Sequence, residues 1–181
     1  MQVHNYTDKH QYMKKIKFLI LCLLSAFAAI SQSSEIEKEQ QAIRNVISNE
    51  TATYYKQDFE AWKKNFVNAD YFRQHGYWEG YEDKVRYFNG FDTLQKVKEL
   101  QFKEDRTYWK GSYEKRFNEN FRIYKDVAWY TFEQDSFEGG TNKFLGRSVE
   151  LRILEKHNGE WKIAYIGYHY LPVSYTGSTK R

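Results

Sequence analysis

The sequence predicts an α+β fold, with helices in the first half of the domain and antiparallel strands in the second. Apolar residues recur at helical spacing from about residue 35 to about residue 100. After about residue 117 the pattern becomes strand-like, and turn residues separate the apolar runs. Helices followed by a run of strands is the element order of α+β domains.

Three helices are expected from the apolar spacing. The first covers roughly residues 35–57 and collects on one face Ile36, Ile43, Val46, Ile47 and Tyr54. Asp58 can cap a second, short helix, whose apolar face holds Phe59, Trp62 and Phe66. Asp92 followed by Gln95 resembles a capping box and starts a third helix with Leu94, Val97 and Leu100. The aromatic segment Tyr71–Gly80 is expected to be part strand and part loop.

Two tight turns organise the strands. Lys125-Asp126 separates the expected strands Asn120–Tyr124 and Val127–Asp135. Asn158-Gly159 is the pair preferred in two-residue type I′ turns, and it predicts that opposed residue numbers sum to 317. One face of this hairpin then carries the pairs Glu155–Lys162, Ile153–Ala164, Leu151–Ile166 and Val149–Tyr168. The other carries Leu154–Ile163, Arg152–Tyr165, Glu150–Gly167 and Ser148–His169.

The two faces of this hairpin differ in character. One is apolar, whereas the other mixes apolar side chains with Glu150, Arg152 and His169. A sheet that is apolar on both sides must be covered on both sides, so we expect helices on one face and a second subunit on the other. Polar groups that interrupt an apolar face indicate the mouth of a cavity.

The first 33 residues are predicted to be a leader with a secretory signal peptide. Met13-Lys-Lys-Ile-Lys17 forms a basic segment, Phe18–Ile30 is apolar except for Ser25, and small or polar residues follow. This apolar stretch is shorter than the roughly 20 residues of a membrane span. The pattern predicts Met13 as the true start, no stable membrane anchor, and a secreted or periplasmic protein. Residues 35–172 are expected to form one domain and 173–181 a tail.

The charge of the chain belongs mostly to this leader. The whole chain holds 28 Lys and Arg against 24 Asp and Glu, a formal charge of +4. Residues 1–33 contain four lysines and one aspartate, which leaves a net +1 for residues 34–181. A nearly neutral domain gives no support for a nucleic-acid partner. Aromatic residues make up 19% of the chain, which excludes a disordered polymer.

Four segments resemble the nuclear transport factor 2-like superfamily, in its SnoaL-like branch. They are Tyr54–Trp62 (YYKQDFEAW), Gly76–Tyr81 (GYWEGY), Asp126–Gln134 (DVAWYTFEQ) and Glu150–Ile163 (ELRILEKHNGEWKI). The resemblance implies a curved antiparallel sheet wrapped around three N-terminal helices, with a cone-shaped pocket, and a homodimer formed through the sheet. That superfamily holds isomerases, cyclases, dehydratases and non-catalytic members, so the fold alone does not decide function.

The resemblance also suggests ligand-binding residues. Glu150 and Arg152 look like the pocket-lining pair in the association domain of calmodulin-dependent kinases, and the same parity on the preceding strand selects Trp129, Thr131 and Glu133. Trp78 in its loop and Tyr165 on the last strand complete the expected pocket. Arg152 can hold an anionic ligand group through its planar fork, or it can form a salt bridge with Glu150 or Glu133.

Candidate acid–base residues are Glu133, Glu150 and His169. A carboxylate in an apolar cavity has a raised pKa and can transfer protons, but one that pairs with Arg152 or meets solvent cannot. His169 can act as a base near neutral pH or be an ordinary surface histidine. His75, His157 and His169 lack metal-ligand spacing, so neither a metal nor another cofactor is expected.

Three classes of function follow from these residues. The first is an exported domain that binds a small, partly apolar molecule, with an anionic group held by Arg152. The second is a SnoaL-like enzyme of the isomerase, cyclase or dehydratase kind. The third is a dimerisation or accessory domain without a ligand. A closed Arg152–Glu pair favours binding, whereas a carboxylate in the cavity that is not paired with Arg152 favours an enzyme.

Overall fold

The computed structural model describes residues 34–78, 85–104 and 109–172. The chain divides into two compact units, residues 1–41 and 42–181. Of the first unit, residues 34–41 are described, and they are helical. The predicted leader and the predicted tail at 173–181 lie outside the described residues, so both stay predictions. Everything below concerns the second unit.

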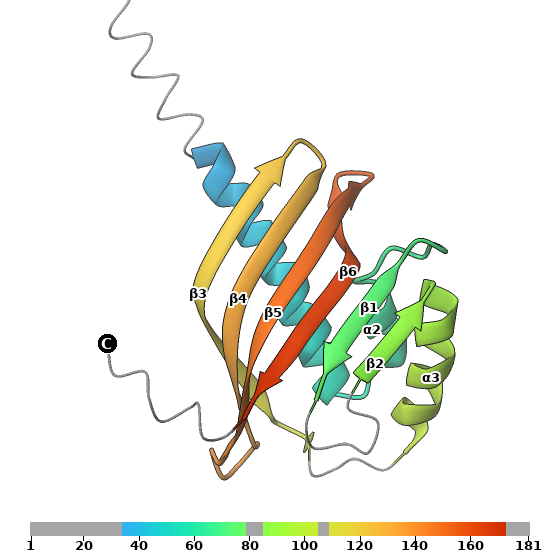
Figure 1. Cartoon of the computed structure of the whole chain (residues 1–181), viewed down its shortest axis with the longest axis vertical. Coiled ribbons are helices and arrows are strands. Elements are labelled where there is room, and N and C mark those ends of the chain that lie inside the picture. Colours follow the sequence, from blue (N-terminus) through green and yellow to red (C-terminus); the bar gives the residue numbers. More distant parts are fainter. Residues whose placement is uncertain (1–33, 79–84, 105–108, 173–181) are drawn as a thin grey trace, which may run out of the picture. The chain divides into compact units, whose positions relative to one another are not determined.

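A curved, open sheet of six strands dominates this unit (Figure 1). The strands are β1 (Arg73–Tyr77), β2 (Val85–Asn89), β3 (Tyr113–Tyr124), β4 (Val127–Phe137), β5 (Phe144–His157) and β6 (Glu160–Leu171). Their order in the sheet is β2-β1-β6-β5-β4-β3. The α+β class is confirmed, but the sheet is mixed rather than purely antiparallel, because β1 runs parallel to β6.

Helices precede and interrupt the strands. One helix covers residues 34–55, close to the predicted range. It is followed by α2 (Phe59–Lys63), which Asp58 caps as predicted by accepting a hydrogen bond from the Ala61 amide at 2.9 Å. The third helix, α3 (Phe91–Lys103), starts at Gly90 without a side-chain cap. The predicted capping box is therefore wrong, because Asp92 already lies inside the first turn.

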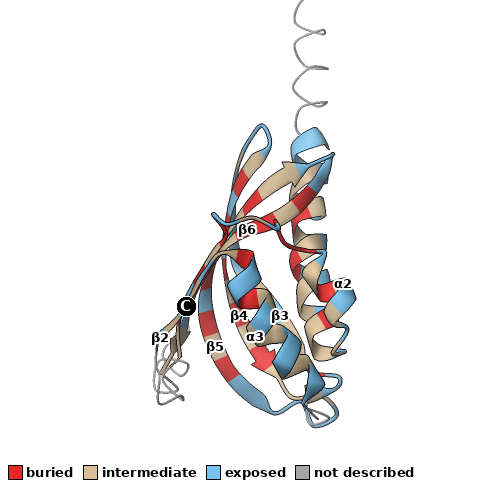
Figure 2. Cartoon of the chain, turned by 90° about the vertical axis from the view of Figure 1, so that its right-hand side faces the viewer, coloured by how far each residue is buried: buried red, intermediate tan, exposed pale blue. Residues whose placement is uncertain are grey.

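The two faces of the sheet have different environments. We call the face that packs against residues 42–55 and α2 the inner face, and the opposite one the outer face. Burial alternates strictly along β4, with Ala128, Tyr130 and Phe132 buried on the inner face (Figure 2). Such alternation is the pattern of a sheet covered on one side.

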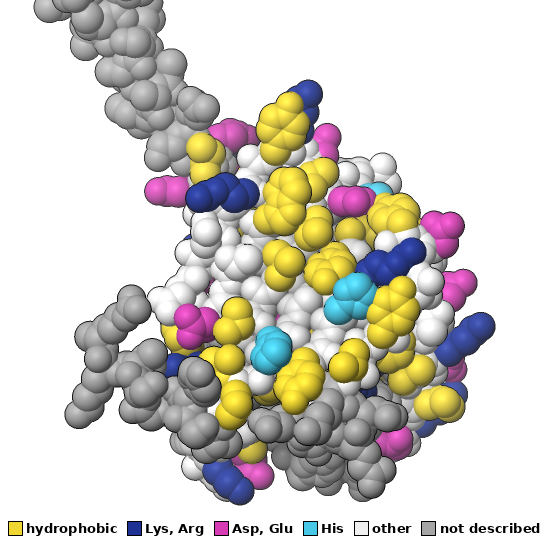
Figure 3. All heavy atoms as spheres, in the orientation of Figure 1, with side chains coloured by type: hydrophobic (Ala, Val, Ile, Leu, Met, Phe, Trp, Pro, Cys, Tyr) yellow, Lys and Arg dark blue, Asp and Glu magenta, His cyan; other side chains and the backbone are white. Residues whose placement is uncertain are grey.

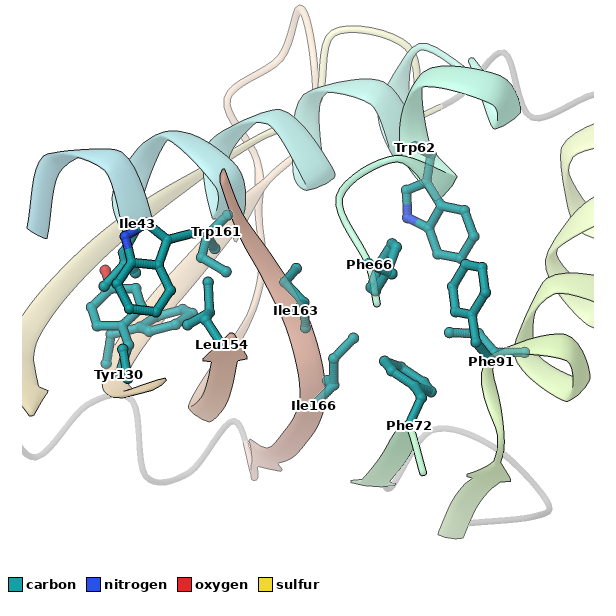
Figure 4. Packing of buried hydrophobic residues seen from close by; sticks show 14 residues of the cluster. Ile43, Trp62, Phe66, Phe72, Phe91, Tyr130, Leu154, Trp161, Ile163 and Ile166 are labelled. Carbon is teal, nitrogen blue, oxygen red and sulfur yellow. The ribbon is translucent and has the colours of Figure 1, made fainter. Parts of the chain in front are cut away.

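The hydrophobic core fills the space between the helices and the inner face. Near one end of the sheet, Ile43 of the long helix lies over Tyr130, Leu154 and Trp161 (Figure 4). A second group of aromatic rings surrounds α2 and comprises Trp62, Phe66, Phe72 and Phe91. Trp62 and Phe66 have ring centroids 4.5 Å apart. Since nearly all these side chains are inaccessible to water, they supply the main apolar stabilisation of the unit.

The predicted Asn158-Gly159 turn is confirmed, but the predicted register holds only near it. Both turn residues have positive φ, as a type I′ turn requires. The pairs Glu155–Lys162 and Leu154–Ile163 form as expected, and then the register shifts, so that Ile153 pairs with Tyr165. Ala164 is the extra residue. From that point on, every residue of β6 faces the side opposite to the one predicted.

A second bulge lies in β3. The Lys125-Asp126 turn is confirmed, because Tyr124 pairs with Val127, and the pairing continues to Asn120 with Thr131. The next pair is Phe117 with Glu133, so β3 holds one residue more than β4 over this interval. Asn118, inside the bulge, has a φ of 51°. The bulge turns Glu114 and Arg116 toward the inner face.

No helix within residues 34–78, 85–104 and 109–172 is long and apolar enough to cross a membrane.

Candidate functional site

The inner face opens into a cavity of about 370 Å³, which we call the inner cavity. It lies beyond the packed core, where the apolar residues of β4 and β5 give way to polar ones. Side chains from the long helix, from α2, from α3 and from all six strands line it. The residues that carry the argument below are Tyr54, Tyr55, Trp78, Lys98, Trp109, Glu114, Gln134, Ser136, Glu150, Arg152, Tyr168 and Tyr170.

Glu150 and Arg152 form a closed ion pair in this cavity. Arg152 Nη1 donates to Glu150 Oε2 at 2.7 Å, and both side chains are more than nine-tenths buried. Ser148 Oγ and Gln134 Nε2 donate to the other carboxylate oxygen. Burial raises the pKa of Glu150, while the guanidinium of Arg152 opposes that rise. The charge of Arg152 is thus matched inside the protein.

Glu114 is a second carboxylate in the same cavity, and its surroundings differ. The hydroxyl of Tyr55 donates to one of its oxygens, and Ser136 Oγ donates to the other at 2.7 Å. Burial raises the pKa of Glu114 to about 7, although these hydrogen bonds and the charge of Arg116 oppose the shift. No ion pair to Glu114 is found among the described residues. A carboxyl group with such a pKa can donate or accept a proton near neutrality.

Aromatic rings form much of the wall. Tyr54 packs against Trp109 and Tyr55, with centroid distances of 5.5 Å and 5.9 Å. Across the cavity, Trp78 stacks on Tyr170 at 4.9 Å. Burial raises the pKa of both Tyr55 and Tyr170, so these phenols stay neutral. A wall of rings with a few convergent polar groups is the usual composition of a small-molecule site.

Gly76 makes room for one of these rings. The ring of Tyr168 lies across the backbone of β1, and a Cβ atom at position 76 would be 1.8 Å from Tyr168 Cζ. Only glycine leaves that space free. Tyr168 therefore lies against the sheet in the inner cavity, near Gln74, and burial raises its pKa.

Three predicted ligand-binding residues line the inner cavity: Trp78, Glu150 and Arg152. Glu150 and Arg152 share the inner face of β5, as the sequence predicts. Trp78 follows β1 directly and is half-buried.

The other predicted site residues lie elsewhere. Trp129, Thr131 and Glu133 occupy odd positions of β4 and face the outer side, because β4 pairs with β5 through Tyr130–Arg152 and Phe132–Glu150. The predicted parity of this strand is wrong. Tyr165 and His169 also face the outer side, because the bulge at Ala164 reverses the orientation of β6.

The outer face is unusually apolar for an exposed surface. Figure 3 shows hydrophobic side chains gathered over the strands. Trp129, Val149 and Tyr87 are each more than two-fifths exposed. Two histidines on this face stack on tyrosines, His75 on Tyr87 at 4.7 Å and His169 on Tyr77 at 4.8 Å. A third, His157 at the end of β5, lies 3.2 Å from a carboxylate oxygen of Glu155.

Sequence reasoning missed Glu114, Tyr55, Tyr168 and Tyr170 as cavity residues. Glu114 lies in a segment where Lys and Arg alternate with acidic residues, a pattern typical of a solvent-exposed hairpin rather than of a cavity wall. The available signal was the Lys125-Asp126 turn, whose register extends the strand back past residue 117. Only the bulge at Asn118, however, turns Glu114 inward.

Within the described segments, no group of three or more His, Cys, Asp or Glu side chains is arranged to hold a metal ion.

Comparison with known proteins identifies the fold. No family model matches the sequence, and no curated protein does. Among solved structures, a cystatin-like-fold protein from Nostoc punctiforme PCC 73102 superimposes with a TM-score of 0.59 at 15% identity, over 74% of this chain and 92% of that one. An NTF2-like protein from Novosphingobium aromaticivorans gives 0.59 at 12% identity, over 81% and 91%.

A third similar structure is a putative ketosteroid isomerase from Shewanella frigidimarina NCIMB 400, with a TM-score of 0.50 at 17% identity over 70% of this chain and 94% of that one. At these identities the likeness concerns the fold alone. The chain has the nuclear transport factor 2-like fold, which confirms the resemblance at that level.

Proposed function

We propose that the domain binds a small, partly apolar molecule in the inner cavity. The observation that carries this proposal is the composition of the cavity, in which about 370 Å³ of space is bounded by aromatic rings and by the carboxylates of buried Glu150 and half-buried Glu114. Ionisable side chains are rare in an ordinary hydrophobic core, because desolvating a charge is unfavourable. Their presence in the cavity wall therefore indicates a functional role. A volume of this size suits a compact ligand with one or two rings.

The closed Glu150–Arg152 pair supports a binding role. Since Glu150 neutralises Arg152, the pair offers directional hydrogen bonds without a net charge. The sequence suggests an anionic ligand group. Such a group would contact the guanidinium of Arg152 and the carboxylate of Glu150 at the same time. Held by Ser148 and Gln134 as well, the pair forms a rigid polar end to a cavity that has aromatic rings elsewhere in its wall.

A test of binding uses two matched variants on β4. Ser136→Leu fills the inner cavity, whereas Thr131→Leu adds the same side chain on the outer face. We expect mass spectrometry to detect small molecules that co-purify with wild type and with Thr131→Leu. The same molecules should be absent from preparations of Ser136→Leu. Identical profiles from all three folded proteins would contradict the proposal and favour an accessory domain without a ligand.

Glu114 favours a second candidate, an enzyme that transfers protons on a bound ligand. Because its pKa is about 7, both the protonated and the ionised form of Glu114 are populated at pH 7, and its side chain is not paired with Arg152. Incubating the protein with the co-purified ligand in D₂O should then incorporate deuterium at carbon, and Glu114→Gln should abolish the exchange. A ligand that binds wild type without any exchange would leave binding as the function.

The outer face is where we place a homodimer contact. Exposed Trp129 and Val149 lie on adjacent strands, and large exposed apolar patches usually mark interaction sites. Trp129→Glu should convert a dimer to a monomer in sedimentation experiments, with Glu160→Gln at the start of β6 as control.

Export from the cytoplasm remains our proposal from the sequence of residues 13–34, and peptide mapping of the mature chain tests it.

A further inference from the structure

The inner cavity holds one carboxylate with a charged partner and one without. Glu150 has Arg152 at 2.7 Å. Glu114 receives hydrogen bonds from Tyr55 and Ser136, and both donors are neutral hydroxyls. Both donors suit the ionised form of the carboxyl group. The charge of Arg116 acts on Glu114, but no cation among the described residues forms an ion pair with it.

The wall next to Glu114 already holds an ammonium group on an aromatic ring. Lys98 Nζ lies 4.5 Å from the ring centroid of Tyr54, which is within the range of cation–π attraction. Tyr54 in turn contacts Trp109 and Tyr55, and Tyr55 donates to Glu114. Rings beside a carboxylate are the arrangement that recognises alkylammonium ligands.

We propose that the inner cavity binds molecules that carry a protonated amine, with the ammonium group paired to Glu114 and the apolar part against the rings of Tyr54 and Trp109. This inference rests on the proposed binding function and names the class of ligand. The amine supplies a direct ion-pair partner for Glu114, and the hydroxyls of Tyr55 and Ser136 keep the carboxylate oriented toward it.

The other charges of the lining are balanced. Of the three acidic and three basic residues there, Glu150 and Arg152 cancel each other, which leaves Glu50 and Glu114 against Arg86 and Lys98. A ligand carboxylate or phosphate would approach Glu114 and Glu150 at once, and like charges in a buried site repel strongly. A cation encounters repulsion from Lys98 and Arg86 but gains a partner in Glu114.

Binding of an amine is expected to depend on pH through Glu114. The groups that face it are Tyr55 on the long helix, Arg116 on its own strand, Glu150 on β5 and Tyr170 on β6. Both tyrosines remain neutral, so Glu114 is the group that titrates near pH 7. Because the amine requires the ionised carboxylate, affinity should weaken about tenfold as the pH falls from 8 to 6.

The experiment compares three probes of one size and different charge: 2-phenylethylamine, 2-phenylethanol and phenylacetate. Binding of each to the full chain is measured by calorimetry at pH 8. We expect the amine to bind about tenfold more tightly than the other two probes, as a charge-assisted hydrogen bond implies. Glu114→Gln should remove that advantage and leave the alcohol unchanged. Glu160→Gln, outside the cavity lining, is the matched control and should bind all three like wild type.

Each outcome decides a different point. Equal or tighter binding of the alcohol or phenylacetate would overturn the amine preference while leaving a binding cavity. Unchanged amine affinity in Glu114→Gln would overturn the role of Glu114. If none of the probes binds wild type, the amine preference is overturned. The binding function itself is overturned only if Ser136→Leu and Thr131→Leu also give identical co-purification profiles. Glutamine keeps the size of the side chain, and an unchanged far-UV circular dichroism spectrum with cooperative unfolding verifies that each variant is folded.

Discussion

The two ends of strands β4 and β5 are equally buried on the inner face but differ in chemistry. At the end next to the β5–β6 turn, Ala128, Tyr130 and Leu154 pack in the apolar core. At the other end, Ser148 and Glu150 are buried to the same degree and line or border the inner cavity. The alternation of side chains along each strand thus decides which positions are buried. Polar side chains at buried positions then mark where the apolar core ends and the inner cavity begins.

The largest effect should come from breaking the ion pair at the cavity end. Arg152→Ala leaves Glu150 buried without its cation, and we expect a loss of about 4 kcal/mol in the free energy of unfolding. Urea denaturation at pH 7 measures it. Arg147→Ala breaks the more exposed pair with Asp135 and should cost about 1 kcal/mol or less. Equal losses in the two variants would show that burial does not distinguish the two pairs.

A smaller effect is expected from the titration of Glu114. The folded protein holds this proton up to a pKa of about 7, whereas the unfolded chain releases it near 4.5, so the folded state binds more protons between these values. Its stability relative to Glu114→Gln should therefore fall as the pH rises from 4.5 to 7, by up to about 3 kcal/mol. Urea denaturation of both proteins at several pH values measures the difference, in which the contribution of Glu150 cancels. A constant difference would contradict the raised pKa.

The smallest effect is expected on the outer face. Val149→Ala removes a side chain that is 44% exposed and should change the unfolding free energy of the monomer by less than about 0.5 kcal/mol. Leu154→Ala, fully buried on the same strand, should cost about 3 kcal/mol. If Val149 lies in a dimer contact, its substitution raises the dissociation constant of the dimer in sedimentation experiments instead.

The sequence predicts the fold better than the site because turns and periodicity are local, whereas bulges are not. Asn158-Gly159 specifies its turn through positive φ values that few residue types tolerate, and the structure confirms it. Nothing in the residues around Ala164 signals that the register shifts there. The prediction consequently assigned Tyr165 and His169 to the face that Tyr168 and Tyr170 occupy.

The same physical cause explains which acidic residues of the cavity can be predicted from the sequence. Glu150 and Arg152 lie beyond the shift but on β5, whose own alternation is regular, so their side could be predicted. The side of Glu133 depends on how β4 pairs with β5, and that of Glu114 on the bulge at Asn118. Residues whose orientation depends on a partner strand require the tertiary structure.

The bulge at Ala164 has a consequence for how such a domain diversifies. Deleting Ala164 would remove the bulge and leave the faces of β6 unchanged, because Ile163 and Tyr165 already pair with the adjacent residues Leu154 and Ile153. If Ala164 were instead paired with Ile153 in a straight register, Tyr165 and His169 would exchange faces with Tyr168 and Tyr170. The core next to the turn would be retained, while the cavity would gain an imidazole and lose two phenol walls. Whether an extra residue in a strand forms a bulge or shifts the register can therefore decide the chemistry of a binding site.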